Sequence, residues 1–310
     1  MNLQGRNFLS LQDFKSEEIR YILNKAKEFK KKRQNGIFNE VYLKGKKLVM
    51  IFQKPSTRTI VSFDIAMKEL GGYTIILNAN ETQLGRNETI HDTGKTLARY
   101  CDAIMARVYD HDDLVDLAIG AGNIPIINGL SNLLHPCQIL ADLMTIEENK
   151  NKLSGLKVAY VGDGNNVANS LLIGCSKMGI NISMANPEGY QPKETIIMTA
   201  KYYTENQNNT VEILNSPIDA VKNADVIYTD TWISMGQENE KEKRELIFFP
   251  YQVNKKLLKY AKSNVIVMHC LPAHRGYEIT NEVIDGPHSV VFDQAENRLH
   301  VQKAILKLLL

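Results

Sequence analysis

The residues most able to do chemistry are a run of hydroxyls and one arginine, Ser56-Thr57-Arg58-Thr59. The apolar run Leu48–Phe52 precedes them, and apolar residues at helical spacing follow. We therefore predict a strand, a tight turn and the start of a helix, with Pro55 in the first turn and Ser56 and Thr57 as caps. Helix N-terminal N–H groups, hydroxyls and a guanidinium together suit a phosphate-like dianion. The alternative is an ordinary capped helix with a surface arginine.

Two further polar groups carry side chains suited to binding. His135 precedes Pro136-Cys137-Gln138, and beside an anion site its ring can donate to a carbonyl oxygen. On its own, such a histidine is more often structural. The Asp230 carboxylate, followed by Thr231 and Trp232, can match an ammonium group. A capped helix with a structural tryptophan would show the same pattern.

His269-Cys270-Leu271-Pro272 places a thiol at the end of a predicted strand. A buried cysteine is usually inert, whereas a reactive thiolate needs positive surroundings, which a set of arginines can provide. No histidine and acid are arranged as obvious partners for a nucleophile. We therefore interpret Cys270 as a positioning group.

These residues follow strand-length apolar runs that alternate with helical patterns. The runs form two series: Leu48–Phe52, Tyr73–Leu77, Ala103–Ala106 and Ile124–Ile127, then Val158–Val161, Ile180–Ala185, Val226–Thr229 and Val265–Met268. Strands alternating with helices predict parallel sheets covered on both faces. We therefore predict an α/β protein with two doubly wound parallel-sheet domains. Because ligands bind beyond the carboxyl ends of such strands, we expect a cleft between the domains.

Polar residues at Lys150–Gly155 predict the domain junction. We assign residues 1–150 to the first domain and 151–292 to the second, with a C-terminal helix at 293–310 returning to the first. A helix is also expected over residues 16–33, with Ser16 as its N-cap. Residues 236–248 are rich in Glu and Lys and predict a mobile loop, either a lid or a solvated insertion.

The bulk composition limits the partners. The 310 residues include 37 basic and 35 acidic side chains, a net charge of +2, which argues against nucleic acid or an anionic membrane as a partner. The four cysteines are widely spaced and indicate neither a disulfide framework nor a zinc cluster. We expect no metal and no cofactor. No apolar run has signal-peptide or membrane-spanning length, so we expect a cytoplasmic protein.

Gly162-Asp163-Gly164-Asn165-Asn166 suggests a dinucleotide-binding turn, because it follows a predicted strand and precedes a helix. The third glycine of that fingerprint is missing, and no acidic residue ends the next strand. We expect instead a tight turn in which Asn166 hydrogen-bonds a small ligand.

The motifs occur together in one order: Ser56–Thr59, Arg107, His135–Gln138, Asp230 with Ser234-Met235-Gly236, and His269–Pro272. With them the sequence closely resembles the ornithine carbamoyltransferases over essentially its full length. The resemblance implies a carbamoyl phosphate-binding domain followed by an ornithine-binding domain. It also implies transfer of the carbamoyl group of carbamoyl phosphate to L-ornithine, giving L-citrulline and phosphate. The expected setting is arginine metabolism, in the direction of biosynthesis.

The resemblance also implies roles for single residues. Carbamoyl phosphate would contact Ser56, Thr57, Arg58, Thr59, Gln83, Arg107, His135, Gln138, Cys270, Leu271 and Arg298. Ornithine would contact Asn166, Asp230, Ser234 and Met235. The residues expected to take part in catalysis are Arg58, Arg107, His135 and Cys270.

Gln83 matches a position that reaches a neighbouring subunit's site, which implies a homotrimer or a multiple of trimers. The family's first motif usually continues with a second arginine, and this chain has Ile60 there, so no role of that cation carries over. Two other functions remain open. One is a transferase for another amine, such as putrescine or acetylated ornithine, against which Ser234-Met235-Gly236 argues. The other is a nucleotide-binding dehydrogenase or a catalytically silent sensor with the same fold.

Overall fold

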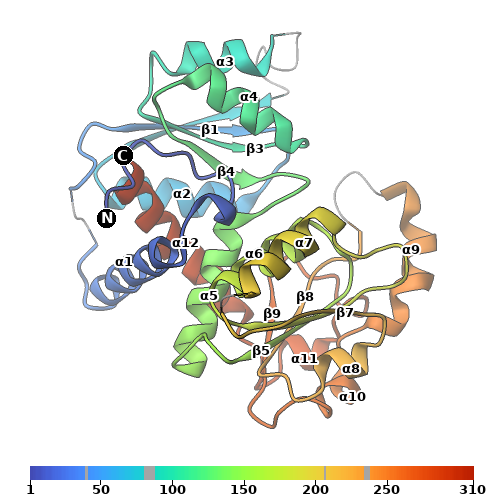
Figure 1. Ribbon diagram of the computed structural model, residues 1–310. Helices are drawn as coiled ribbons and strands as arrows, with labels where there is room; N and C mark the ends of the chain where they lie inside the picture. Colours follow the sequence, from blue (N-terminus) through green and yellow to red (C-terminus); the bar gives the residue numbers. More distant parts are fainter. Residues whose placement is uncertain (39–40, 80–87, 206, 234–237) are drawn as a thin grey trace. The chain divides into compact units, whose positions relative to one another are not determined.

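The computed structural model describes residues 1–310 except 39–40, 80–87, 206 and 234–237. Its contacts divide the chain into two compact units (Figure 1), with boundaries after Ala141 and after Ala295, each inside a helix. The first domain is Met1–Ala141 with Glu296–Leu310, and the second is Asp142–Ala295. Each contains one parallel sheet with helices on both faces, so the predicted class of two doubly wound α/β domains is confirmed. The cleft between the domains stays a prediction.

The first domain has a four-stranded parallel sheet in the order β2-β1-β3-β4. Its strands are β1 (Lys47–Phe52), β2 (Tyr73–Asn78), β3 (Ala103–Arg107) and β4 (Ile126–Leu130). Its helical elements include η1 (Leu11–Asp13), α1 (Ser16–Gln34), α2 (Thr57–Glu69), α3 (Ile90–Leu97) and α4 (His111–Ala121). α3 and α4 cover one face of the sheet, and α1 and α2 lie on the other (Figure 1). Both faces of the central strand β1 are therefore buried, as its continuous apolar run requires.

The C-terminal helix α12 (Val291–Leu309) returns to the first domain, as predicted. It lies beside α1 (Figure 1), where the Lys30 ammonium donates to the Asn297 side-chain oxygen at 2.9 Å. The Gly5 N–H donates to the Leu309 carbonyl at 2.8 Å, which joins the two ends of the chain. The long helix α5 (Pro136–Lys150) leads from the first domain into the second.

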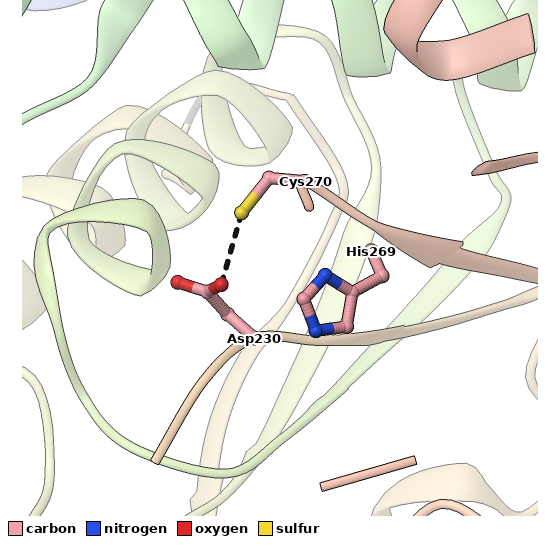
Figure 2. Close-up of side chains that lie close together, drawn as sticks. All are labelled: Asp230, His269 and Cys270. Atoms are coloured by element: carbon pink, nitrogen blue, oxygen red, sulfur yellow. Dashed lines mark hydrogen bonds between the residues drawn. The ribbon is translucent and has the colours of Figure 1, made fainter. Parts of the chain in front are cut away.

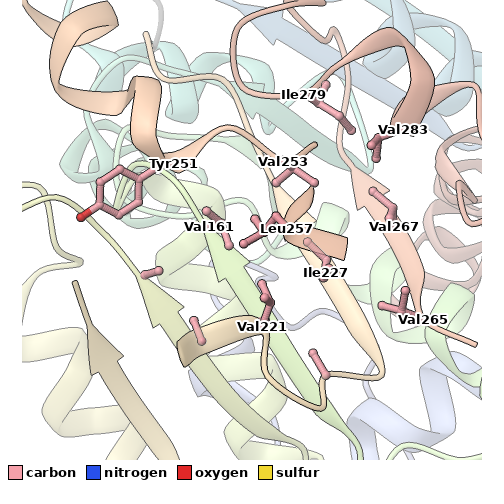
Figure 3. Close-up of a cluster of buried hydrophobic side chains, with 14 of the residues drawn as sticks. Val161, Val221, Ile227, Tyr251, Val253, Leu257, Val265, Val267, Ile279 and Val283 are labelled. Carbon is pink, nitrogen blue, oxygen red and sulfur yellow. The ribbon is translucent and has the colours of Figure 1, made fainter. Parts of the chain in front are cut away.

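The second domain has a five-stranded parallel sheet in the order β7-β6-β5-β8-β9. Its strands are β5 (Lys157–Val161), β6 (Asn181–Ala185), β7 (Val211–Leu214), β8 (Val226–Thr229) and β9 (Ile266–His269). Its remaining elements are α6 (Asn166–Lys177), α7 (Glu194–Thr204), α8 (Pro217–Val221), η4 (Glu238–Glu240), α9 (Lys241–Phe248), η5 (Phe249–Tyr251), α10 (Lys255–Leu258) and α11 (Asn281–Ile284). On one face, Val161, Ile227 and Val267 pack against apolar side chains of α8, α10 and α11 (Figure 3).

The strand orders explain where polar residues gather. In each sheet the chain order reverses between two neighbouring strands, β1 and β3 in the first domain and β5 and β8 in the second. Loops at such a point leave the sheet in opposite directions, which opens a crevice beyond the strand ends that suits a ligand. Phe52 pairs with Arg107 at the first point, and Tyr160 pairs with Tyr228 at the second. The predicted site residues that directly follow β1, β5 and β8 therefore lie at these two points.

Several predicted boundaries differ from the structure. The fourth strand lies at Ile126–Leu130 instead of 124–127, because Pro125 lacks the N–H that a ladder needs. The short, partly exposed edge strand β7 was not predicted, since Val211–Leu214 is not an apolar run. Lys15, not Ser16, is the N-cap of α1. Ser56 alone caps α2, so Thr57 is its first residue and Pro55 lies before the helix.

The predicted loop at 236–248 is wrong for most of its length. Residues 236 and 237 lie outside the described residues, but residues 238–248 form η4 and α9. Glu and Lys are good helix formers, and pairs four positions apart support them, as with Lys241–Glu245. Among the described residues, none of the helices combines the length and the apolar character needed to cross a lipid bilayer.

Candidate active site

The turn predicted to bind an anion lies at the start of α2. The Ser56 hydroxyl accepts from the Thr59 N–H at 3.3 Å and donates to the Thr59 hydroxyl at 3.0 Å. Just before this turn, the Gln53 N–H donates to the Arg107 carbonyl at 2.9 Å. Arg107 at the end of β3 is therefore held beside the turn that carries Ser56 and Arg58.

Arg298 joins this group from the distant end of the chain. Its guanidinium is buried and donates to the Gln138 side-chain oxygen at 2.6 Å and to the Thr59 hydroxyl at 3.4 Å. Three predicted site residues from α2, α5 and α12 thus meet within one domain. Charge-assisted hydrogen bonds of this kind fix the orientation of the amide and the hydroxyl.

His135 lies at the centre of the positive charge. Burial lowers the pKa of its ring well below the ordinary value, and the charges of Arg298, Arg107 and Arg58 lower the pKa further. The ring is therefore neutral at pH 7, and it can donate an N–H without adding another positive charge. Three guanidiniums acting on one buried ring make this end of the sheet electropositive, which suits an anion.

Lys54 is a further cation that sequence reasoning did not include. It immediately precedes Pro55, is 7% exposed, and its ammonium lies 4.5 Å from the centre of the Tyr109 ring. A buried lysine is uncommon unless something compensates its charge. Its position in the sequence, between the end of β1 and the turn at Ser56, could have indicated that Lys54 belongs to this group.

In the second domain, Asp230 is the centre of a hydrogen-bonded group. It follows β8 and is 5% exposed. One carboxylate oxygen accepts from the Cys270 thiol at 2.9 Å (Figure 2), and the other accepts from the Asn165 amide at 2.8 Å. Asp230 and Cys270, 40 positions apart, are thus brought together as predicted site residues.

Asn165 was missed, because the prediction chose its neighbour Asn166. The Asn165 side-chain oxygen caps α6 by accepting from the Val167 and Ala168 N–H groups, at 2.9 and 3.1 Å. Its NH₂ group is then directed to Asp230. The signal was present, since asparagine directly before a helical pattern is a preferred N-cap. Asn166 is the first residue of α6 and is partly exposed.

Leu271 is held in an unusual conformation. Its φ angle is +58°, in the left-handed region that a branched side chain rarely adopts, and its bond to Pro272 is cis. The Leu271 N–H donates to His269 Nδ1 at 2.9 Å, while His269 Nε2 lies 3.0 Å from a Glu278 carboxylate oxygen. A left-handed backbone conformation at a branched residue persists only where the surroundings hold it, and it often occurs at functional sites.

Asp230, His269 and Cys270 could be read as a metal site, because one ligand atom from each lies within 4.8 Å of the others (Figure 2). The sequence spacing gave no sign of this group. However, both ring nitrogens of His269 already take part in hydrogen bonds, to Leu271 and Glu278. A metal needs a nitrogen lone pair, so the group fits a polar ligand better than a metal.

The glycines after β5 do not form a dinucleotide site. A Cβ at Gly164 would overlap the backbone of Gln191 and Pro192, and the Gly164 N–H donates to the Tyr190 carbonyl at 2.8 Å. The chain itself thus covers the surface that a pyrophosphate would approach in a nucleotide-binding turn. Close packing of this loop explains why glycine is present.

The predicted site residues fall into two groups, each within one domain. The first domain holds Ser56, Thr57, Arg58, Thr59, Arg107, His135, Gln138 and Arg298, and the second holds Asn166, Asp230, Cys270 and Leu271. Gln83, Ser234 and Met235 lie outside the described residues.

Two family models match the chain. The model "aspartate/ornithine carbamoyltransferase, carbamoyl-P binding domain" matches residues 6–148, and "Asp/Orn binding domain" of the same family matches residues 154–309. An anabolic ornithine carbamoyltransferase of Pyrococcus furiosus is 57% identical, over 100% of this chain and 98% of the relative.

Solved structures agree. The ornithine carbamoyltransferase structure from Pyrococcus furiosus has a TM-score of 0.96 at 57% identity, covering 100% of this chain and 98% of that one. The anabolic ornithine carbamoyltransferase of Campylobacter jejuni has a TM-score of 0.91 at 40% identity and covers 97% of each chain.

Proposed function

The chain belongs to the aspartate/ornithine carbamoyltransferase family, and from that premise we propose that it is an ornithine carbamoyltransferase. It transfers the carbamoyl group of carbamoyl phosphate to the side-chain amine of L-ornithine and releases L-citrulline and phosphate. One close relative is named an anabolic enzyme, which supports a role in arginine biosynthesis.

The observation that favours ornithine over aspartate is the buried Asp230 carboxylate. It is 5% exposed, and its oxygens accept from Cys270 and Asn165. The α-ammonium group of ornithine, which stays charged while the side-chain amine attacks, complements this carboxylate. Aspartate has only the amine that attacks, and its second carboxylate would be repelled by Asp230. Cys270 and Leu271 line the position where the amine approaches. Asn166, Ser234 and Met235 complete the proposed ornithine contacts.

Carbamoyl phosphate binds in the first domain. The N–H groups and hydroxyls at the start of α2 hold the phosphate, and Arg58 and Arg107 neutralise its charge. Arg298 orients Gln138 and Thr59 through hydrogen bonds of 2.6 and 3.4 Å. Gln138 and the neutral His135 contact the carbamoyl group.

The reaction forms a bond between the amine nitrogen and the carbamoyl carbon and breaks the bond from that carbon to the phosphate oxygen. The amine attacks in its neutral form, and because a free alkyl ammonium has a pKa near ~10.4, the positive site must lower that value. As the carbonyl oxygen gains negative charge, Thr59, His135 and Arg107 stabilise it. The departing phosphate accepts the proton of the amine.

The protein forms a homotrimer or a multiple of trimers, with Gln83 reaching a neighbouring subunit's site. Supporting this, the edge strand β2 exposes large apolar side chains: Tyr73 is 64% exposed, Ile75 46% and Ile76 42%. An uncovered apolar edge strand favours association, and a second copy of the chain would cover it. Ile75→Lys should therefore dissociate the oligomer, as measured by analytical ultracentrifugation. An unchanged mass would exclude this edge as the interface.

We place the protein in the cytoplasm, a reducing compartment, and all four cysteines are free thiols.

The test is a citrulline assay with purified protein, carbamoyl phosphate and a panel of amines. Ornithine should give product, while aspartate, putrescine and acetylated ornithine should give little. Product with another amine and none with ornithine would overturn the substrate assignment. Titration with NADH, followed by Trp232 fluorescence, should give no saturable change if the dehydrogenase alternative is wrong.

A further inference from the structure

Arg244 is a buried cation of the second domain that none of the assignments above uses. It lies in α9, and its side chain is 7% exposed. Removing a guanidinium from water is costly unless its partners are well placed. The partners of Arg244 therefore indicate what it holds in position.

Among the residues that the structure describes, the guanidinium has three hydrogen-bonding or ionic partners. One terminal nitrogen donates to the Trp232 carbonyl at 2.9 Å and lies 3.3 Å from an Asp163 carboxylate oxygen. The inner nitrogen donates to the Glu240 carboxylate at 2.9 Å. The guanidinium also lies 5.0 Å from the centre of the Tyr190 ring, a typical cation–π distance.

Two of these partners belong to the turns that carry Asp230 and its amide donor Asn165. Asp163 lies in the turn after β5, two positions before Asn165, whose amide donates to Asp230 at 2.8 Å. Trp232 lies in the turn after β8, two positions after Asp230 itself. A single side chain thus joins the two backbone segments that carry Asp230 and its amide donor.

Trp232 gives a way to observe this connection. It is the only tryptophan of the chain, it is 2% exposed, and its ring is stacked on Phe248 with centres 6.0 Å apart. Phe248 and Arg244 both belong to α9. The fluorescence of the protein therefore reports whether α9 and the turn after β8 remain in place.

We propose that Arg244 is a positioning residue for the amino acid substrate. By joining Asp163 to the Trp232 carbonyl, it keeps the Asp230 carboxylate in the geometry that receives an ammonium group. Arg244 affects the affinity for ornithine and not the affinity for carbamoyl phosphate. This inference rests on the proposed function.

The experiment compares steady-state constants of the full-length enzyme and five variants. Arg244→Gln should raise the KM for ornithine on the order of tenfold, the equivalent of about 1.4 kcal/mol, and leave the KM for carbamoyl phosphate within about twofold. Arg244→Lys keeps the charge but cannot reproduce the planar fork, so its ornithine KM should be intermediate. In Arg244→Gln the Trp232 emission should shift to longer wavelength.

Two variants serve as controls. Glu240→Gln removes the partner whose side chain is 54% exposed, and Arg275→Gln removes a surface ion pair with Asp285 in the same domain. Exposed pairs contribute little, so both should keep the wild-type ornithine KM. If Arg244→Gln does not fold, Asp163→Asn replaces it as the test, because asparagine keeps an oxygen acceptor and the side-chain size. Asp163→Asn should also raise the KM for ornithine and not the KM for carbamoyl phosphate, but by a smaller factor than Arg244→Gln.

The outcomes separate this inference from the proposed function. Wild-type protein that makes no citrulline from ornithine overturns the proposed function. Wild-type protein that makes citrulline, with an unchanged ornithine KM in Arg244→Gln or in Asp163→Asn, overturns only the positioning role. An equal rise of both KM values, or a fall in kcat alone, shows a general structural role instead and also overturns it.

Discussion

The Cys270 thiol donates its hydrogen to an Asp230 carboxylate oxygen at a sulfur–oxygen distance of 2.9 Å. The neighbouring His269 ring cannot act as a base toward the sulfur, since its nitrogens bond to Leu271 and Glu278. We therefore interpret this thiol as a group that orients the carboxylate and is not activated for attack. The site of the second domain is therefore built around the carboxylate.

Cys270→Ser should keep most of the activity, because a hydroxyl can still donate to Asp230. We expect turnover with ornithine within roughly tenfold of wild type, whereas loss of a true nucleophile costs roughly a thousandfold or more. Cys270→Ala removes the donor and should raise the ornithine KM further. Cys175→Ser, in α6, is the control. A serine variant without measurable turnover would contradict the positioning role.

Arg58→Ala should lose most turnover while the protein stays folded. Removing one group that stabilises charge in the transition state costs about a hundredfold to a thousandfold in kcat. Arg99→Ala, an exposed arginine of the same domain, should behave as wild type. Thermal unfolding of both variants checks the fold. Near-normal turnover in Arg58→Ala would discard the phosphate-binding assignment.

Asp230→Asn should weaken ornithine binding selectively. Hydrogen bonds to charged groups contribute about 1.5–3 kcal/mol, so the ornithine KM should rise between roughly tenfold and a hundredfold. The KM for carbamoyl phosphate should change little, because we propose that the phosphate binds the first domain. If Asp230→Ala kept the ornithine KM of wild type, this residue would not select the amine substrate.

The His135 ring should not titrate across the neutral range. Burial and the three arginines hold the pKa of His135 well below its ordinary value of 6.5. The unfolded chain gains this proton near pH 6.5 and the folded protein does not, so the stabilising contribution is present above pH 6.5 and is lost as pH falls through the folded pKa. The ring resonance of His135, assigned with His135→Gln, should stay constant by NMR from pH 8 to 6. A midpoint near 6.5 would exclude the neutral ring.

Asp163 should make the stability depend on pH in the opposite direction to His135. Burial raises the pKa of its carboxyl from 3.8 to about 6, against the lowering influence of Arg244. The folded state then holds this proton more tightly than the unfolded chain, so the stabilising contribution is complete below pH 3.8 and is lost as pH rises through about 6. Integrated over that window, the contribution is about 3 kcal/mol.

The measurement is urea unfolding of wild type and Asp163→Asn between pH 4 and 8. As pH rises, the unfolding free energy of wild type should fall relative to that of Asp163→Asn, because only wild type carries the titrating carboxyl. A constant difference across this range would show that the pKa of Asp163 is not raised.

The sequence predicted most of the fold because strand-length apolar runs mark buried parallel strands, as at Val226–Thr229. β7 was missed because an edge strand is covered less and needs no apolar run. α9 was missed because its charged surface looks like a loop, and the tertiary contacts of Arg244 and Phe248 cannot be seen from composition.

The candidate site was predicted from motifs more than from spacing. The meeting of Thr59, Gln138 and Arg298 depends on pairs separated by 160 and 239 positions, which no local pattern contains. Asn165 was passed over for Asn166 because adjacent asparagines look alike until the helix start is known. Arg244 carries no motif, and only its buried partners indicate its importance.

The return of α12 to the first domain has a consequence for synthesis of the protein. Arg298 bonds to Gln138 across 160 positions, so the whole second domain leaves the ribosome before this contact can form. A nascent chain that has folded only its first sheet still lacks one of the guanidiniums that face His135. The carbamoyl phosphate site that we propose for the first domain is therefore completed only after the ornithine-binding sheet has also been made.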